Sequence, residues 1–142
     1  MPLENLEKLV KVGELKFEPR VQAEFCGMVE SAKSRLKGSL IEGLAVDSCF
    51  SLAYNAAHTL ALAAMRWHGY RSENRYLVFQ CLQHTVGLDS DKLSVLAKCY
   101  KQCNRAEHEG YLEVSSQLLE ELVCITEELL ELVEELDCVV AE

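Results

Sequence analysis

Four polar residues lie between positions 101 and 108, at a spacing that puts them on one side of a helix. They are Lys101, Asn104, Arg105 and His108. At about 100° per residue they gather within two turns. An imidazole titrates near neutral pH and can act as a general base, and a cation beside it can hold a phosphate group. A solvated helix face has the same composition, so the pattern alone leaves both interpretations open.

The opposite side of the same segment is apolar. Leu96, Cys99, Cys103 and Ala106 follow one another at spacings of three and four residues. This periodicity predicts a helix from about Asp89 to Gly110 with the two cysteines buried as small apolar residues. We therefore expect the polar residues to face away from the core.

Helical periodicity elsewhere predicts the elements that must position this segment. The expected helices span residues 3–12, 20–37, 49–68, 73–86 and about 115–137, in addition to 89–110. Asp47 or Ser48 is expected to cap the third helix, Ser115 or Ser116 is expected to cap the last, and Gly38 is expected to end the second. The helix at 49–68 is rich in alanine, which places it at the centre of a bundle or at an interface. No strand pattern is present. The sequence thus predicts an all-α, antiparallel up-and-down bundle of about five to six helices in a single domain, 1–142.

The composition excludes several classes of protein. Hydrophobic residues make up 49% of the 142 residues and there are only two prolines, as expected of a globular chain. The longest apolar run is far too short to cross a bilayer, so we expect no membrane span. Seven cysteines, an odd number, and the lack of a secretory signal favour a cytoplasmic protein. His58, His68 and His84 show no ligand spacing, so neither a metal nor a cofactor is expected.

The charge is distributed unevenly along the chain. Residues 1–105 carry all fourteen Lys and Arg against eleven acidic residues, a net charge of +3, whereas residues 106–142 carry twelve acidic residues and no Lys or Arg, which gives the total of −9. Polyphosphates bind beside cations, so any nucleic-acid contact must use the first part. The acidic last helix is either a solvated face or a docking surface for a basic partner.

Two stretches resemble the HEPN domain family. Residues 104–110, NRAEHEG, are similar to its motif region, in which Arg-Asn is followed four residues later by His or Tyr. Residues 52–57, LAYNAA, and 68–71, HGYR, are similar to its central helix and the exit from that helix. The resemblance extends over about residues 3–137, with one departure: Cys103 stands at the position of the motif arginine.

This resemblance implies an antiparallel helical bundle that forms a homodimer, commonly in toxin–antitoxin or defence systems beside a minimal nucleotidyltransferase. Active members cleave RNA without metal, using the arginine and histidine of the motif in the dimer cleft. Here Asn104 and His108 match the motif, whereas Cys103 does not. Arg105 cannot simply replace the missing arginine, because it lies about 200° around the helix from Cys103.

Two functions follow from the resemblance. The first is a dimeric, non-catalytic or weakly active HEPN-like module that binds nucleotide or RNA through Lys101, Asn104, Arg105 and His108 and works with a nucleotidyltransferase or an antitoxin protein. The second is a metal-independent endoribonuclease whose catalytic residues are His108, Asn104 and Arg105, assisted by Lys101. Position 103 is the feature that separates them.

Overall fold

The computed structural model describes the backbone of residues 2–11, 13, 15–110 and 114–141. Side chains are described in these ranges except at 2–5, 107–109 and 137–141. Helices dominate the described residues, which confirms the all-α class. The elements are α1 (Pro2–Lys11), β1 (Lys16–Phe17), α2 (Gln22–Ser39), α3 (Val46–Trp67), β2 (Tyr70–Arg71), α4 (Arg75–Gln80), α5 (Leu82–Thr85), α6 (Ser90–Glu109) and α7 (Ser116–Ala141).

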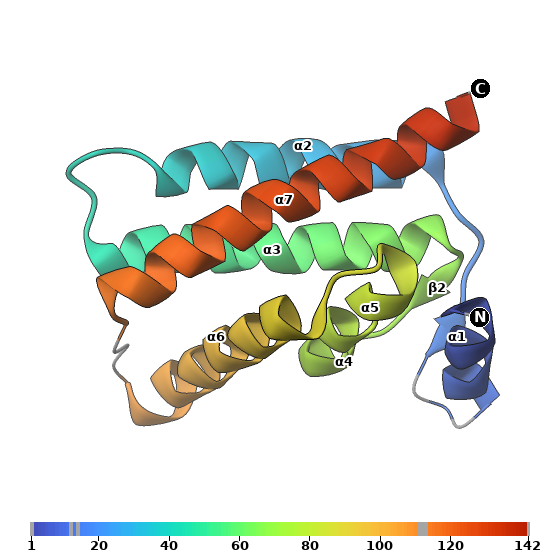
Figure 1. Cartoon of the computed structure of the whole chain (residues 1–142), viewed down its shortest axis with the longest axis horizontal. Helices are drawn as coiled ribbons and strands as arrows, with labels where there is room; N and C mark the ends of the chain where they lie inside the picture. The colour runs from blue at the N-terminus through green and yellow to red at the C-terminus, as the bar shows by residue number, and fades with distance from the viewer. Residues whose placement is uncertain (1, 12, 14, 111–113, 142) are drawn as a thin grey trace.

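The long helices form a bundle along the longest axis of the molecule. Helices α2, α3 and α7 pack side by side, and α6 packs against α7 and α4 (Figure 1). Following the chain, α2 and α3 run in opposite directions, as do α6 and α7. The short helix α1 lies beside α5 at one end. Within the described residues, no helix combines the length and the apolar character needed to cross a membrane.

Helix α3 lies at the centre of the bundle. Its alanines are almost completely buried, and so are Phe50, Leu60 and Met65. Small side chains let α2 and α7 approach its backbone closely, which accounts for the alanine-rich sequence. The alternative expectation, that these alanines form an interface with another molecule, is wrong because α2 and α7 already cover them. The buried alanines are Ala53, Ala56, Ala57, Ala61, Ala63 and Ala64.

Two very short strands were not expected from the sequence. Lys16 pairs with Arg71 and Phe17 pairs with Tyr70, which makes β1 and β2 an antiparallel ladder. Each strand is two residues long, so no alternating pattern could reveal it. The Phe17 and Tyr70 rings also contact each other, with centroids 5.0 Å apart. The ladder fixes the segment before α2 to the exit of α3.

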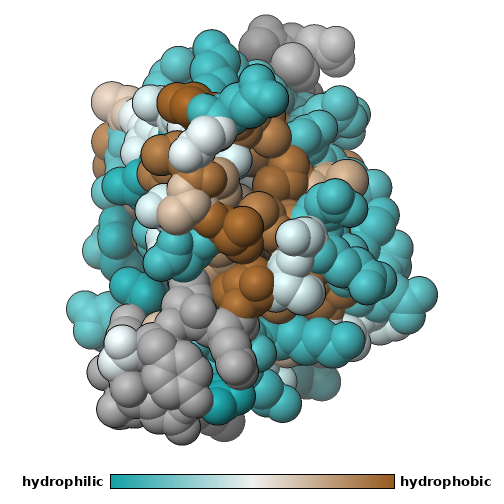
Figure 2. All heavy atoms as spheres, turned by 90° about the vertical axis from the view of Figure 1, so that its left-hand side faces the viewer, coloured by the Kyte–Doolittle hydropathy of each residue, from teal (hydrophilic) through white to brown (hydrophobic). Residues whose placement is uncertain are grey.

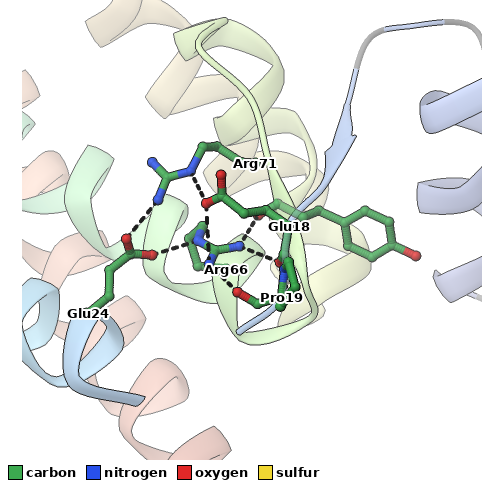
Figure 3. A network of polar contacts seen from close by, with 6 residues as sticks. Glu18, Pro19, Glu24, Arg66 and Arg71 are labelled. Carbon is green, nitrogen blue, oxygen red and sulfur yellow. Dashed lines mark hydrogen bonds and ion pairs between the residues drawn. The ribbon is translucent and has the colours of Figure 1, made fainter. Parts of the chain in front are cut away.

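A buried arginine holds the same segment (Figure 3). The Arg66 guanidinium donates to the carbonyl oxygens of Glu18 and Pro19, each at 2.7 Å, and to the Glu24 carboxylate at 2.6 Å. Arg71 completes the network by pairing with the carboxylates of Glu18 and Glu24. Every donor that Arg66 directs into the protein therefore meets an oxygen, which makes burial of this charge tolerable.

Several helix ends differ from the expectation. Helix α3 begins at Val46 after Ala45, with no side-chain cap, so Asp47 and Ser48 lie inside its first turn rather than at its N-cap. Helix α2 continues through Gly38, where a side chain would meet Leu52 Cδ1 at 3.2 Å. This glycine thus permits close packing and does not end the helix.

The segment predicted as one helix over 73–86 is divided. Helix α4 ends at Gln80 and α5 begins at Leu82, with Cys81 between them in a turn. The His84 N–H donates to the Cys81 carbonyl at 2.8 Å, a tighter bond than the α-helical pattern. A local tightening of the helix does not change the spacing of hydrophobic residues, so the sequence pattern could not predict it.

Other ends are confirmed. The Asp89 carboxylate accepts the Lys92 N–H at 3.1 Å and caps α6, and the Ser115 hydroxyl accepts the Leu118 N–H at 3.1 Å and caps α7. Gly110 adopts a φ of 82° after α6, a left-handed conformation that glycine enters without strain. The segment that carries the predicted site is therefore a helix with defined ends.

Candidate functional site

Helix α6 is oriented by its apolar side, as predicted. Leu96 and Cys99 are fully buried against the bundle, and burial raises the pKa of the Cys99 thiol to about 12. Cys103 and Ala106, further along the same stripe, are only half-buried. The expectation that both cysteines are buried thus holds for Cys99, whereas Cys103 lies at the boundary between the core and a surface cleft.

The predicted polar residues do not all face one way. Lys101 and Arg105 are exposed, whereas Asn104 is half-buried and turns toward the cleft that Cys103 lines. The backbone of His108 belongs to the last turn of α6, but its side chain lies outside the described residues. The structure therefore places Asn104 beside Cys103 and leaves the contacts of the His108 imidazole a prediction.

The cleft has a volume of about 500 Å³ and is built from three helices. Tyr54 lines it from α3, and Arg75 lines it from the first turn of α4. Three residues on one side of α6 also line it, and Glu73 and Asn74 line it just before α4. The α6 residues are Tyr100, Cys103 and Asn104. Asn74 also caps α4 by accepting the Leu77 N–H at 3.1 Å, which fixes the start of α4 and therefore the place of Arg75.

The charge of Arg75 acts on two neighbouring side chains. Burial raises the pKa of Tyr54 above its usual range, with Cys103 adding to the rise, while the Arg75 guanidinium opposes it. Burial, and then the positive charge of Arg75, lower the pKa of His58 to about 4. His58 is therefore an uncharged imidazole at neutral pH, packed edge-on against Phe79 with ring centroids 5.7 Å apart.

Aromatic side chains lie in and beside the cleft. The Tyr76 and Tyr100 rings lie 5.6 Å apart and tilted by 54°, and Tyr76 is 43% exposed. On the buried side, Tyr54 meets Phe79 edge-on at 5.6 Å. The cleft thus combines a guanidinium, an amide and the half-buried Tyr100 ring, and the exposed Tyr76 ring lies against Tyr100 beside it. This set suits a ligand with both a negative group and a flat ring.

Sequence reasoning missed Arg75, Tyr76 and Tyr100, and it treated Tyr54 only as a core residue. Tyr54 does lie in the stretch that resembles the HEPN central helix, so that resemblance was a signal for it. Arg75 and Tyr76 follow a polar turn and have no spacing that relates them to α6. Only the packing of α4 against α6 brings them to the motif.

The other described histidine and cysteine side chains that could bind a metal or react lie away from the cleft. Within the described part of the chain, no group of three or more His, Cys, Asp or Glu side chains is arranged to hold a metal ion. His68 makes a 3.1 Å hydrogen bond with the Thr85 carbonyl, and burial lowers its pKa. Cys26 and Cys124 are exposed on α2 and α7.

A second hollow lies at the end of the molecule where α2 joins α3. It has a volume of about 750 Å³, and Ala106 and Gly110 of the motif segment form part of its wall. Beside it, the connection from α2 to α3 exposes several large apolar side chains, and Figure 2 shows hydrophobic residues gathered on this face. The exposed residues, each at least 40% accessible, are Leu40, Ile41, Leu44 and Val46. We call these four residues the apolar end.

The sequence matches no protein-family model and no curated protein.

Proposed function

We propose that this chain is a HEPN-like helical module that binds RNA or nucleotide at the cleft between α4 and α6, with little or no cleavage. One observation carries the proposal: the segment with the HEPN-like pattern is not buried in the bundle but opens, at Cys103 and Asn104, onto a cleft that contains the Arg75 guanidinium. A cleft beside a cation is a suitable environment for a phosphate group.

The chemistry of position 103 supports binding without efficient turnover. Cleavage at a phosphate requires a cation held where negative charge develops, and Cys103 provides neither charge nor a strong donor. Loss of one preorganised group of this kind typically lowers the rate by about 10²–10³. Lys101 and Arg105 are exposed on the outer side of the same turns and give this part of α6 two further positive charges.

The proposal includes a setting for the protein. We infer a cytoplasmic homodimer whose motif helices lie near the two-fold axis, acting with a minimal nucleotidyltransferase or an antitoxin protein in a toxin–antitoxin or defence system. The apolar end supports the dimer, since it adjoins the last turn of α6 and exposes large hydrophobic side chains. Self-association would remove this surface from water.

Arg75 also favours a second candidate, the metal-independent endoribonuclease. Its guanidinium lines the same cleft as Cys103 and could supply the cation that the motif lacks. In that case His108 would act as the general base, with Asn104 and Arg105 assisting. The two candidates share one binding site and differ in whether the bound RNA is cut.

A ribonuclease and binding assay separates them. The natural chain, Cys103→Arg and His108→Ala are incubated with single-stranded RNA, and both retention and cleavage of the RNA are measured. We expect the natural chain to bind RNA in a salt-sensitive manner and to cleave it poorly, and Cys103→Arg to cleave it faster. Efficient cleavage by the natural chain that His108→Ala abolishes would establish the endoribonuclease instead. If none of the three proteins binds RNA or nucleotide, both candidates are wrong.

A further inference from the structure

The cleft residue with the most distinctive surroundings is Arg75, and its role bears on what the proposed site binds. Several other cations in the described part of the chain are committed to carboxylates: Arg66 and Arg71 to Glu18 and Glu24, and Lys33 and Lys92 to acidic residues of α7. None of the ion pairs among the described residues involves Arg75. Its guanidinium is hydrogen-bonded to Tyr54 and its charge also acts on His58, and neither of these side chains carries a negative charge at neutral pH.

A guanidinium in this position can bind an oxyanion. Its planar donors match two oxygens of a phosphate, and it sits in a cleft rather than on a convex surface. Arg75 belongs to α4 and lines the same cleft as Cys103 of α6. Helix α4 therefore supplies the cleft with the cation that α6 lacks at position 103.

The tyrosine pair next to Arg75 adds a second recognition element. Tyr76 is its chain neighbour and 43% exposed, and Tyr100 lines the cleft itself. Their rings are in contact, which limits the freedom of both. Accessible aromatic rings held beside a cation are the arrangement on which nucleic-acid bases stack without regard to sequence.

Glu73 limits the charge that the cleft can accept. Glu73 lines the same cleft, so one acidic and one basic residue lie beside the ligand. A phosphodiester carries a single negative charge and fits this balance, whereas a nucleoside triphosphate would bring several negative charges next to Glu73. Like charges at close range disfavour that ligand.

We propose that the cleft binds one unit of single-stranded RNA, with an internucleotide phosphate on Arg75 and the adjacent base against Tyr76 and Tyr100. This rests on the proposed function and deepens it by naming the ligand unit and the residues that hold it. Binding is set by Arg75 and the tyrosines, and Glu73 weakens it.

The test is fluorescence anisotropy of a labelled single-stranded RNA of adenosines at low salt. Arg75→Gln is expected to weaken binding about tenfold or more, because it removes a charge-assisted hydrogen bond to phosphate. Glu73→Gln is expected to tighten binding about two- to fivefold, because it removes a repulsion in a solvated cleft. Tyr76→Leu should weaken binding about fivefold or more, whereas Tyr76→Phe keeps the ring and the affinity.

Arg35→Gln is the matched control. It removes the same charge from α2, where Arg35 donates to the Thr59 hydroxyl at 3.2 Å, and it should change the affinity less than about twofold. Unlabelled AMP, ATP and inorganic phosphate serve as competitors. We expect AMP to compete better than ATP or phosphate alone, since it brings a base with less charge, and a short RNA to compete best.

Specific results would overturn the inference. Equal losses in Arg75→Gln and Arg35→Gln would mean that only the overall charge matters, and stronger competition by ATP than by RNA would reject the phosphodiester. If RNA binding persists in Arg75→Gln but is lost in Lys101→Gln or Arg105→Gln, the proposed function survives and this site is wrong. If the natural chain binds no RNA, both are wrong. Should Arg75→Gln fail to fold, as judged by circular dichroism, a gain of affinity in Glu73→Gln and the Tyr76 pair still decide the question, because unfolding cannot tighten binding.

Discussion

His58 is a half-buried imidazole whose proton affinity differs strongly between the folded and unfolded states. Its folded pKa is about 4, against an ordinary value of 6.5, because of burial and the nearby Arg75 charge. Above the unfolded pKa both states are neutral. As the pH falls from 6.5 toward 4 the unfolded chain binds a proton that the folded chain does not, so stability is lost across this window.

We therefore expect His58→Gln to reduce the sensitivity to acid. Between about pH 7 and about pH 5 the natural chain should lose about 2 kcal/mol more unfolding free energy than the variant, as measured by urea denaturation at each pH. The Glu24 carboxyl, whose pKa is lowered first of all by its hydrogen bond to Arg66, titrates below 4.5 and thus outside this comparison. Equal losses in the two proteins would show that His58 is not the group responsible.

Removal of the buried Arg66 should cost much of the stability. Arg66→Met would leave the carbonyl oxygens of Glu18 and Pro19 and the Glu24 carboxylate without their buried donor. The expected loss is about 3–5 kcal/mol in chemical denaturation. Arg35→Met, which removes an exposed guanidinium, is the control and should cost less than about 0.5 kcal/mol. A similar small loss for both would mean that water replaces the Arg66 donors.

For single residues, the sequence predicted which side chains of α6 are buried better than it predicted which residues of other helices lie next to them. The apolar stripe of α6 correctly placed Leu96 and Cys99 inside and Lys101 and Arg105 outside. It could not reveal that Cys103 and Asn104 open onto a cleft, because the far wall of that cleft comes from α4. A helical wheel describes one helix, and a site between helices requires their packing.

Among the elements, α6 and α3 begin in different ways that mutagenesis can distinguish. Asp89 caps α6 through the Lys92 N–H, whereas Asp47 sits inside the first turn of α3 and accepts only the N–H of the next residue, Ser48. Asp89→Ala should therefore lower the unfolding free energy by about 1 kcal/mol. Asp47→Ala removes an acid from the same end of a helix but no cap, and should cost less than about 0.5 kcal/mol. A larger loss for Asp47→Ala would favour the cap that the sequence suggested.

Helices were predicted well where burial of one face gives the sequence a helical periodicity. Breaks and short strands, which depend on individual backbone hydrogen bonds, were predicted poorly. The inward stripe of α7, which includes Leu122, Leu129 and Val133, is buried as expected. The break at Cys81 is a local change in backbone hydrogen bonding, and the β1–β2 ladder is a pairing between residues far apart in the chain. Neither leaves a periodic signal.

For the whole molecule, the prediction concerns assembly. We expect light scattering to give the mass of a dimer at micromolar concentration, with the apolar end at the interface. Ile41 is 59% exposed, and Ile41→Asp would place a charge in that interface and shift the protein toward monomer. Val21→Asp is the control. Val21 is similarly exposed, but it lies at the N-terminus of α2, whereas Ile41 follows the C-terminus of that helix. A monomeric natural chain, or equal dissociation by both variants, would contradict this interface.

The uneven charge of the sequence is partly balanced within the fold. Lys33 on α2 pairs with Glu134, and Lys92 on α6 pairs with Glu128, so α7 forms ion pairs with two neighbouring helices. Other acidic residues of α7, such as Glu127 and Glu131, are exposed, in agreement with a solvated face. The sequence total of −9 could not show which cations these carboxylates would take.

The Arg66 network has a consequence for how the chain may be divided. It joins Glu18 and Pro19, which precede α2, to the end of α3 through noncovalent hydrogen bonds and ion pairs (Figure 3). A fragment that begins after Pro19 would expose a guanidinium shaped to receive two carbonyl groups. A synthetic peptide with the sequence of residues 1–19 is then its complement, and adding it in trans would rebuild the missing corner. The opening segment behaves as a built-in ligand of the bundle, and tethering gives it a high local concentration.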